Sequence, residues 1–213
     1  MTYQFDVLNH THPNLVTAYD MGIVIPKNLL KDDTHFENHG KIFGNPTLDT
    51  PLFRVKRTHC MRFDGKNDFI KFQNPLIDLK EFSIAFWVNP ESWNGVVFSV
   101  SKKENTYISF NGLGNLVFAV SGKGPMTRQS HPIKTTYFVC CTKSSSCEGK
   151  IYVNGKFLMN GQTGIDTHEK TAYLARYETQ QMDFKGRLDT VLFYNRLLEP
   201  EQVQGLYRRA NPR

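Results

Sequence analysis

The alternation of hydrophobic and polar residues along the chain is typical of short β-strands. Residues 82–88 alternate strictly between two faces, and Pro90 follows them. Phe82, Ile84 and Phe86 share one face of this segment. Because successive side chains of a strand point to opposite faces, this pattern predicts a strand that packs its aromatic face against a core.

Similar short runs lie along most of the chain, and residues with turn propensity separate them. They predict further strands at 15–21, 60–63, 68–72, 96–100, 106–110, 116–120, 135–142, 150–153, 156–159 and 172–176. Residues 26–43 are rich in loop formers and are expected to be irregular, and residues 44–47 to form a turn. Asp64-Gly65 and Asn154-Gly155 each lie between apolar runs, which predicts two hairpins.

The segment 185–196 differs from the others because it is long and apolar on both faces, which indicates a strand buried between layers. It lies near the C-terminus, so it must pair with strands formed much earlier. Residues 199–209 then predict a short amphipathic helix with Pro200 at its first position. The whole pattern predicts an all-β fold, an antiparallel β-sandwich or jelly roll with one short C-terminal helix. We expect one domain over residues 1–213, with 1–14 as a lead-in segment.

Charge and hydropathy narrow the range of partners. The chain has 213 residues and a net charge of +6, which permits contact with acidic polymers. The basic residues are dispersed, and the basic segment 54–57 is too short on its own for a nucleic-acid site, which needs Lys and Arg interleaved with exposed aromatic residues. Nucleic acid is therefore not an expected partner. No run of eighteen apolar residues occurs, so no membrane span is expected. The N-terminus has no signal-peptide pattern, and we expect cytoplasmic synthesis unless a signal has been removed.

The four cysteines, Cys60, Cys140, Cys141 and Cys147, match no zinc pattern. Free thiols are expected without a secretion signal, and a bridge between Cys141 and Cys147 is the alternative. Cys140 and Cys141 are neighbours on one predicted strand and point to opposite faces, so at most one is expected to face the core.

Four segments carry a resemblance to a known family. They are F-D-G-K-N-D-F-I at 63–70, F-S-I-A-F-W-V-N-P at 82–90, I-Y-V-N-G-K at 151–156 and F-K-G-R-L-D-T-V-L-F-Y-N-R-L-L at 184–198. In this order they resemble the laminin-G-like branch of the concanavalin A-like lectin/glucanase superfamily. The resemblance covers roughly residues 15–209 and implies two curved antiparallel sheets packed face to face. It places function on the concave sheet or on the rim loops.

The resemblance also implies a metal site. Related jelly rolls often hold one Ca²⁺ between an early loop rich in Asp and Asn and the Asp of the closing strand. The matching residues are Asp33, Asn38 and Asp189. The alternative is that Asp189 accepts a hydrogen bond from loop amides or from Arg62, because a carboxylate within an apolar strand needs a partner.

Catalysis is not expected. Glycosidases of this superfamily carry carboxylates spaced E-x-D-x-x-E on one strand, and this sequence has no such run. The leading hypothesis is a non-catalytic recognition module that binds a glycan or a protein surface. One alternative is a structural or assembly component of a larger particle such as a viral capsid or tail, which would make the chain virion-associated. The other is a polysaccharide-active enzyme.

Two aromatic residues are candidates for glycan contact, because sugar-binding sites use exposed aromatic faces. Trp93 lies in a predicted loop between Ser92 and Asn94, and Tyr177 follows the short strand predicted at 172–176. Trp87, in contrast, lies on a core-like strand and is expected to be a packing residue.

Overall fold

The computed structural model describes residues 14–26, 28–52, 59–100, 105–165, 168–177 and 182–210. The lead-in segment up to residue 13 and the basic residues Arg54, Lys56 and Arg57 lie outside this part. None of the described helices is long and apolar enough to cross a lipid bilayer.

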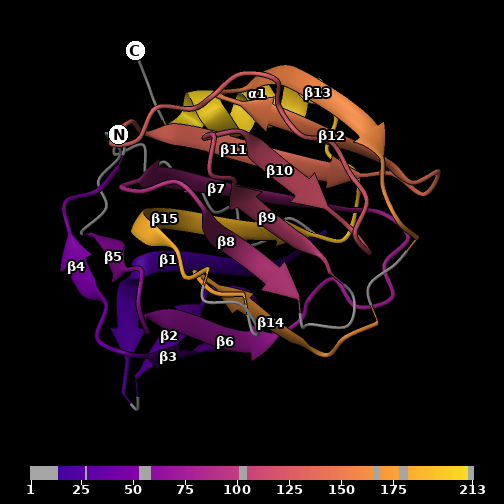
Figure 1. Ribbon diagram of the computed structural model, residues 1–213. Coiled ribbons are helices and arrows are strands. Elements are labelled where there is room, and N and C mark those ends of the chain that lie inside the picture. Colours follow the sequence, from indigo (N-terminus) through magenta and orange to yellow (C-terminus); the bar gives the residue numbers. More distant parts are fainter. Residues whose placement is uncertain are drawn as a thin grey trace, which may run out of the picture.

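The described chain forms a β-sandwich with one C-terminal helix (Figure 1). Its elements are β1 (Leu15–Ile25), β2 (Leu29–Asp32), β3 (Gly40–Phe43), β4 (Thr47–Asp49), β5 (Cys60–Asp64), β6 (Phe69–Gln73), β7 (Phe82–Pro90), β8 (Gly95–Val100), β9 (Tyr107–Phe110), β10 (Leu116–Ala119), β11 (Tyr137–Lys143), β12 (Glu148–Val153), β13 (Lys156–Gln162), β14 (Thr171–Leu174), β15 (Lys185–Tyr194) and α1 (Pro200–Ala210). The all-β prediction with one short C-terminal helix is confirmed.

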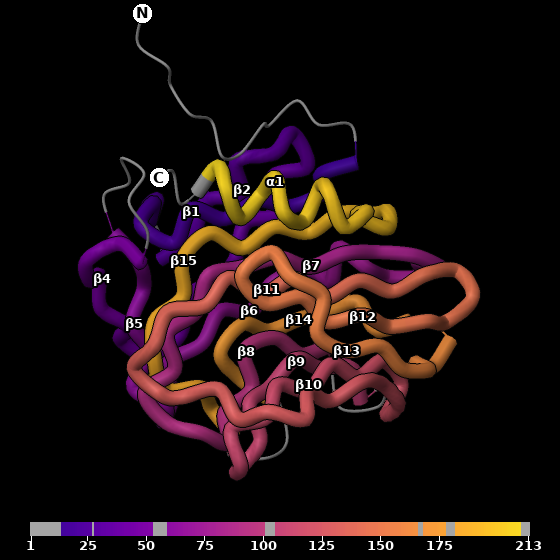
Figure 2. Tube along the Cα trace, turned by 90° about the horizontal axis from the view of Figure 1, so that it is seen from above, coloured from indigo at the N-terminus to yellow at the C-terminus, as the bar shows by residue number. Residues whose placement is uncertain are grey.

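Two antiparallel layers face each other across the core. The front layer has the strand order β10–β9–β8–β14–β6–β3, and the back layer has the order β1–β15–β7–β11–β12–β13. β1 joins the layers, because it pairs with β15 near its start and with β2 near its end. Figure 2 shows the helix lying over the outer side of the back layer.

β15 is central to the back layer, as its apolar pattern predicted. One edge pairs with β7 along its length. The other edge pairs with β5 at its first residues and with β1 at its last. Phe193 faces the core between the layers, whereas Leu192 faces the helix. Both sides of the strand are therefore covered, and its partners come from distant parts of the sequence.

The helix explains why β7 and β11 are buried on both faces. Val203 of α1 is fully buried, and the ring of Tyr207 stacks on Trp87 with centroids 5.8 Å apart. Cys141 faces the core and Cys140 lies beneath the helix, so both are buried as free thiols. The sequence expectation that at most one faces the main core holds, but the helix buries the other as well.

Two local predictions were wrong. Residues 26–43 contain β2 and β3, which the loop-forming residues around their short apolar pairs concealed. The Asp64-Gly65 turn does not close a hairpin, because β5 pairs with β4 and β15 while β6 pairs with β3 and β14. The turn instead leads from one layer to the other. The Asn154-Gly155 hairpin between β12 and β13 is confirmed.

Candidate functional site

The outer face of the front layer presents a hollow over β8, β9 and β10. Ile108 and Phe110 of β9 point into the core, so the alternating Tyr107 and Ser109 point outward. Val117 of β10 lies opposite Ser109 and faces outward with it. The strand pattern that builds the core therefore also fixes which side chains line the hollow.

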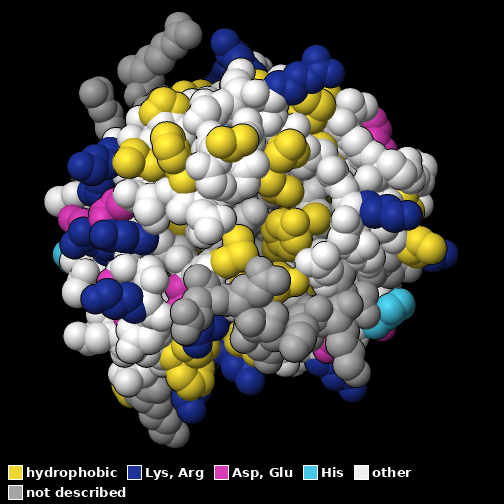
Figure 3. Space-filling view, in the orientation of Figure 1, with side chains coloured by type: hydrophobic (Ala, Val, Ile, Leu, Met, Phe, Trp, Pro, Cys, Tyr) yellow, Lys and Arg dark blue, Asp and Glu magenta, His cyan; other side chains and the backbone are white. Residues whose placement is uncertain are grey.

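We call this feature the tyrosine hollow, and its volume is about 230 Å³. It is lined by Asn94, Val96, Asn105, Tyr107, Ser109, Asn111, Val117, Tyr177 and Met182. Figure 3 shows hydrophobic side chains gathered on the face of the molecule where β8 and β9 lie. The lining combines aromatic rings, three carboxamides, a hydroxyl and aliphatic groups.

The two tyrosines are held in a defined arrangement. Their ring centroids lie 5.9 Å apart at an interplanar angle of 85°. The hydroxyl of Tyr177 donates a hydrogen bond to Oδ1 of Asn105 at 2.8 Å. Burial raises the pKa of Tyr177, and neighbouring Tyr107 adds to this effect. The phenol is therefore a neutral hydrogen-bonding group at physiological pH.

Arg176 fixes the segment that carries Tyr177. Its guanidinium donates two hydrogen bonds to the carboxylate of Asp183, at 3.0 and 2.8 Å. The same guanidinium lies 3.9 Å from the ring centroid of Phe69 on β6. These contacts hold the ends of a connection whose residues Tyr177 and Met182 both line the hollow.

The structure brings one of the two predicted glycan-binding residues into the hollow. Tyr177 lines it, whereas Trp93 is not among the lining residues, although the next residue in the chain, Asn94, is one of them. Trp93 as a whole residue is 42% exposed, and its Nε1 donates a hydrogen bond to the carbonyl of His131 at 3.1 Å.

Sequence reasoning missed Tyr107, Asn105 and Asn111. The available signal was the alternation within 106–110, which places Tyr107 and Ser109 together on the face opposite Ile108 and Phe110. What the pattern did not show was that, within the described part of the chain, no further element covers this face.

The three residues predicted to bind calcium have separate partners. Asp33 forms an ion pair with Lys31 at 3.0 Å. Asn38 donates its side-chain amide hydrogens to Thr17 and to the carbonyl of Gln73. Among the described residues, no three or more His, Cys, Asp and Glu side chains are grouped to hold a metal ion. This donor set does not resemble the oxygen cage that Ca²⁺ prefers.

Asp189 is fully buried, and its Oδ2 accepts a hydrogen bond from the backbone N–H of Leu52 at 3.2 Å. One of its contacts is therefore the hydrogen bond with a loop amide that was the alternative to calcium binding. Calcium at these three residues stays a prediction. A thermal melt that is the same with and without EDTA would remove it.

The carboxylate that organises the early loop is Asp32, which sequence reasoning passed over in favour of Asp33. Oδ1 of Asp32 accepts hydrogen bonds from the backbone of Ala18 and Thr34, and Oδ2 accepts from Thr34 Oγ1 and the Asn38 backbone. This buried carboxylate thus ties the loop after β2 to β1.

A comparison of the sequence with models of protein families identifies the family of this chain. The model of the concanavalin A-like lectin/glucanases superfamily matches residues 64–204, which span β6 to the first part of α1 and include every residue of the tyrosine hollow. The chain belongs to this superfamily. The resemblance read from the four motifs is therefore confirmed. No curated protein sequence gives a significant match to this superfamily member.

Solved structures share the fold of this superfamily member at low sequence identity. Domain 4 of AbnA, an extracellular arabinanase from Geobacillus stearothermophilus solved with arabinotriose, has a TM-score of 0.72 and 21% identity, over 91% of this chain and 98% of that one. The binding domain of Paraclostridial Mosquitocidal Protein 1 has a TM-score of 0.71 and 17% identity, over 92% of this chain. The binding domain of botulinum neurotoxin serotype D has a TM-score of 0.70 and 16% identity, also over 92%. This chain spans about half the length of those two toxin domains, 52% and 51%.

Proposed function

We propose that this chain is a non-catalytic recognition module that binds a glycan in the tyrosine hollow. The observation that carries the proposal is the lining itself, where Tyr107 and Tyr177 stand among three carboxamides. Aromatic rings offer flat apolar surface to a sugar ring, and carboxamides both donate to and accept from sugar hydroxyls. The hollow offers these two kinds of contact within one small volume.

The position of several lining residues on paired strands supports the proposal. Ser109 and Val96 lie on paired strands, β9 and β8, of a sheet whose other face is the core. Sites built on strands hold their contact groups more precisely than sites on loops alone, which lowers the ordering cost of binding. The Arg176–Asp183 pair anchors the connection that supplies Tyr177.

The chemistry of the described lining favours binding over cleavage. A glycosidase places two carboxyl groups on either side of the bond that it breaks, about 5 to 9.5 Å apart. The described residues of the hollow supply amides, hydroxyls and apolar groups instead. Arabinotriose in the structure of the similar arabinanase domain is consistent with saccharide binding on this fold.

A glycan array probed with the purified chain tests the proposal. We expect the wild type to bind a restricted set of glycans, and the Tyr107→Ala and Tyr177→Ala variants to lose that set. Phe157→Ala is the matched control, because Phe157 is an aromatic residue that is 51% exposed on β13. Loss of binding in Phe157→Ala but not in the tyrosine variants would contradict the proposal, as would an array with no bound glycan. Recovery of the chain only within a multi-chain particle would favour an assembly role instead.

A further inference from the structure

A second hollow lies on the outer face of the back layer, where β5, β15 and the end of β7 meet the loop before β11. We call it the cationic hollow, and its volume is about 580 Å³. It is lined by Arg62, Glu91, Ile133, Lys134, Lys185 and Arg187. Pockets for small ligands commonly have volumes of about 300–1,000 Å³. The 91–94 turn connects the two sites, because Glu91 lines this hollow and Asn94 lines the tyrosine hollow.

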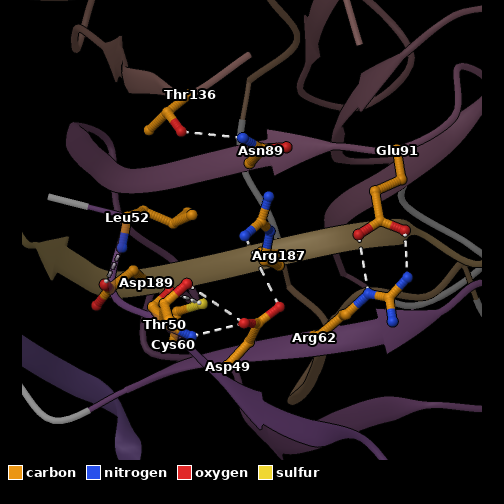
Figure 4. A network of polar contacts seen from close by, with 10 residues as sticks. All are labelled: Asp49, Thr50, Leu52, Cys60, Arg62, Asn89, Glu91, Thr136, Arg187 and Asp189. Carbon is orange, nitrogen blue, oxygen red and sulfur yellow. Dashed lines mark hydrogen bonds and ion pairs between the residues drawn. The ribbon is translucent and has the colours of Figure 1, made fainter. Parts of the chain in front are cut away.

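Positive charge dominates the cationic hollow. Of its six described lining residues, four are Lys or Arg, and Glu91 is the one carboxylate among them. Arg62 already engages that carboxylate with two hydrogen bonds of 2.8 Å, which Figure 4 shows as parallel dashed lines. These bonds hold the pKa of Glu91 below its usual range, with further help from Arg187 and Lys185. An entering anion would therefore meet Lys134, Lys185 and Arg187.

Arg187 has unused hydrogen-bonding capacity. A guanidinium offers five N–H donors in a planar fork. The Nη1 atom of Arg187 lies 3.7 Å from Oδ2 of Asp49, which is close enough for an ion pair but too far for a hydrogen bond. Its Nε has no hydrogen-bond acceptor among the residues that the structure describes. Figure 4 shows the side chain extended between β15 and Asn89 of β7.

The backbone around the hollow is constrained so that the cations converge. Gly186 has φ of +151°, and a Cβ there would lie 2.5 Å from the carbonyl oxygen of Asn89. Glycine thus lets β15 approach β7 closely, between Lys185 and Arg187. Lys134 has φ of +59° and its N–H donates to the carbonyl of Pro90 at 2.6 Å. A left-handed lysine carries a conformational cost, and such strained residues cluster at functional sites.

We propose that the cationic hollow binds the sulfate or carboxylate group of an acidic saccharide. Lysines provide point charges, and a guanidinium matches the geometry of either oxyanion. The cations converge on one concavity from three separate segments, which suits a compact charged group on a sugar. Single-stranded nucleic acid would call for stacking aromatic rings, whereas the described lining contributes only Ile133 as an apolar residue. The saccharide class extends the proposed function, but this hollow has its own residues and its own test.

Binding of the full chain to dextran sulfate, polygalacturonate and uncharged dextran tests the inference. We expect one of the two acidic polymers to bind and dextran not to bind through this site. The preferred acidic polymer identifies sulfate or carboxylate as the recognised group. Lys134→Gln/Arg187→Gln should weaken this binding about tenfold at low salt, since each exposed charge contact contributes modestly. Raising the salt from about 50 mM to about 300 mM should weaken wild-type binding through screening.

Matched variants separate a site from general attraction to a basic protein. Lys156→Gln/Arg208→Gln removes one Lys and one Arg from exposed positions on β13 and α1, and should leave the affinity nearly unchanged. Lys134→Gln/Lys185→Gln is a second hollow variant for the case that Arg187→Gln impairs folding. It changes two exposed lysines, so it should fold normally and should also bind the acidic polymer more weakly. An equal loss of affinity for the acidic polymer in the control variant and in the hollow variants would overturn the inference.

Two further outcomes would also overturn it. One is the absence of binding to both acidic polymers. The other is single-stranded DNA binding that is equally strong and equally sensitive to the hollow variants, which would make nucleic acid the partner. The lysine and arginine variants should keep the wild-type binding to uncharged glycans on the array, because none of their changed residues lines the tyrosine hollow. Failure of the glycan proposal would therefore appear in the tyrosine variants, and failure of this inference in the lysine and arginine variants.

Discussion

Several single polar side chains in this protein organise a loop that the β-strands alone would not define. Asp32 gathers four hydrogen-bond donors from β1 and the loop after β2. Asp68 accepts from the backbone of Asn45 at 2.7 Å and of Asp64 at 3.0 Å, across the turn between the layers. Buried carboxylates with several donors are costly to remove, because those donors lose their acceptor.

Replacing Asp32 by alanine should lower the free energy of unfolding by about 3 kcal/mol, because charge-assisted hydrogen bonds to a buried group are lost. Asp33→Ala is the matched control, since the Lys31–Asp33 pair has a lysine side chain that is 46% exposed and should contribute less than about 1 kcal/mol. Urea unfolding curves of both variants measure the difference. Equal destabilisation by the two changes would contradict the role given to Asp32.

His131 should make stability depend on pH. It is buried between the rings of Phe110 and Tyr137, and burial lowers its pKa, partly opposed by its contact with the carbonyl of Gly114. The unfolded chain then binds a proton more readily than the folded chain. The contribution to stability is therefore complete above about pH 6.5 and is lost as the pH falls through the folded-state pKa.

Thermal melts across this pH range measure the effect, and His131→Gln should flatten the part of the profile below about pH 6.5. A wild-type profile that falls in the same way as that of the variant would assign the pH dependence to other groups.

At the scale of elements, the sequence predicted best where both faces of a strand follow a simple pattern. The apolar run of β15 predicted its burial on both faces. The alternation within β7 predicted the face that meets the core, whereas the cover that the helix gives to its other face was not predicted. β2 and β3 are four residues each, so tertiary pairing rather than local pattern defines them. The Asp64-Gly65 signal correctly marked a turn, but a turn signal does not say whether the chain returns along the same sheet or crosses to the other.

Gly186→Ala tests the close approach of β15 to β7. The alanine would have to adopt φ of +151° and place its Cβ 2.5 Å from a backbone oxygen, so we expect a loss of at least about 2 kcal/mol in the free energy of unfolding. Gly112→Ala is the control, because a Cβ there meets nothing within 4 Å. That variant should be neutral or slightly stabilising. Chemical denaturation compares them, and similar stabilities would contradict the constraint at Gly186.

At the scale of the whole molecule, the tyrosine hollow and the cationic hollow lie on the outer faces of opposite layers. The tyrosine hollow draws on three strands, the 91–94 turn and the connection before β15. Tyr177 could be predicted from the sequence as an aromatic residue after a strand. Tyr107 could not be assigned to the same site, because only the fold shows that the segments around 107 and 177 meet. Asp33 was preferred to Asp32 for a similar reason, since side-chain direction in an irregular loop is not set by spacing.

The most direct test of the account is calorimetric titration of the chain with a glycan that it binds on the array. We expect the Tyr107→Ala/Tyr177→Ala variant to bind at least about tenfold more weakly, since two aromatic contacts are lost. Phe157→Ala should retain the wild-type affinity. A double tyrosine variant that folds normally and binds the glycan as tightly as the wild type would contradict the claim that the tyrosine hollow is the glycan site.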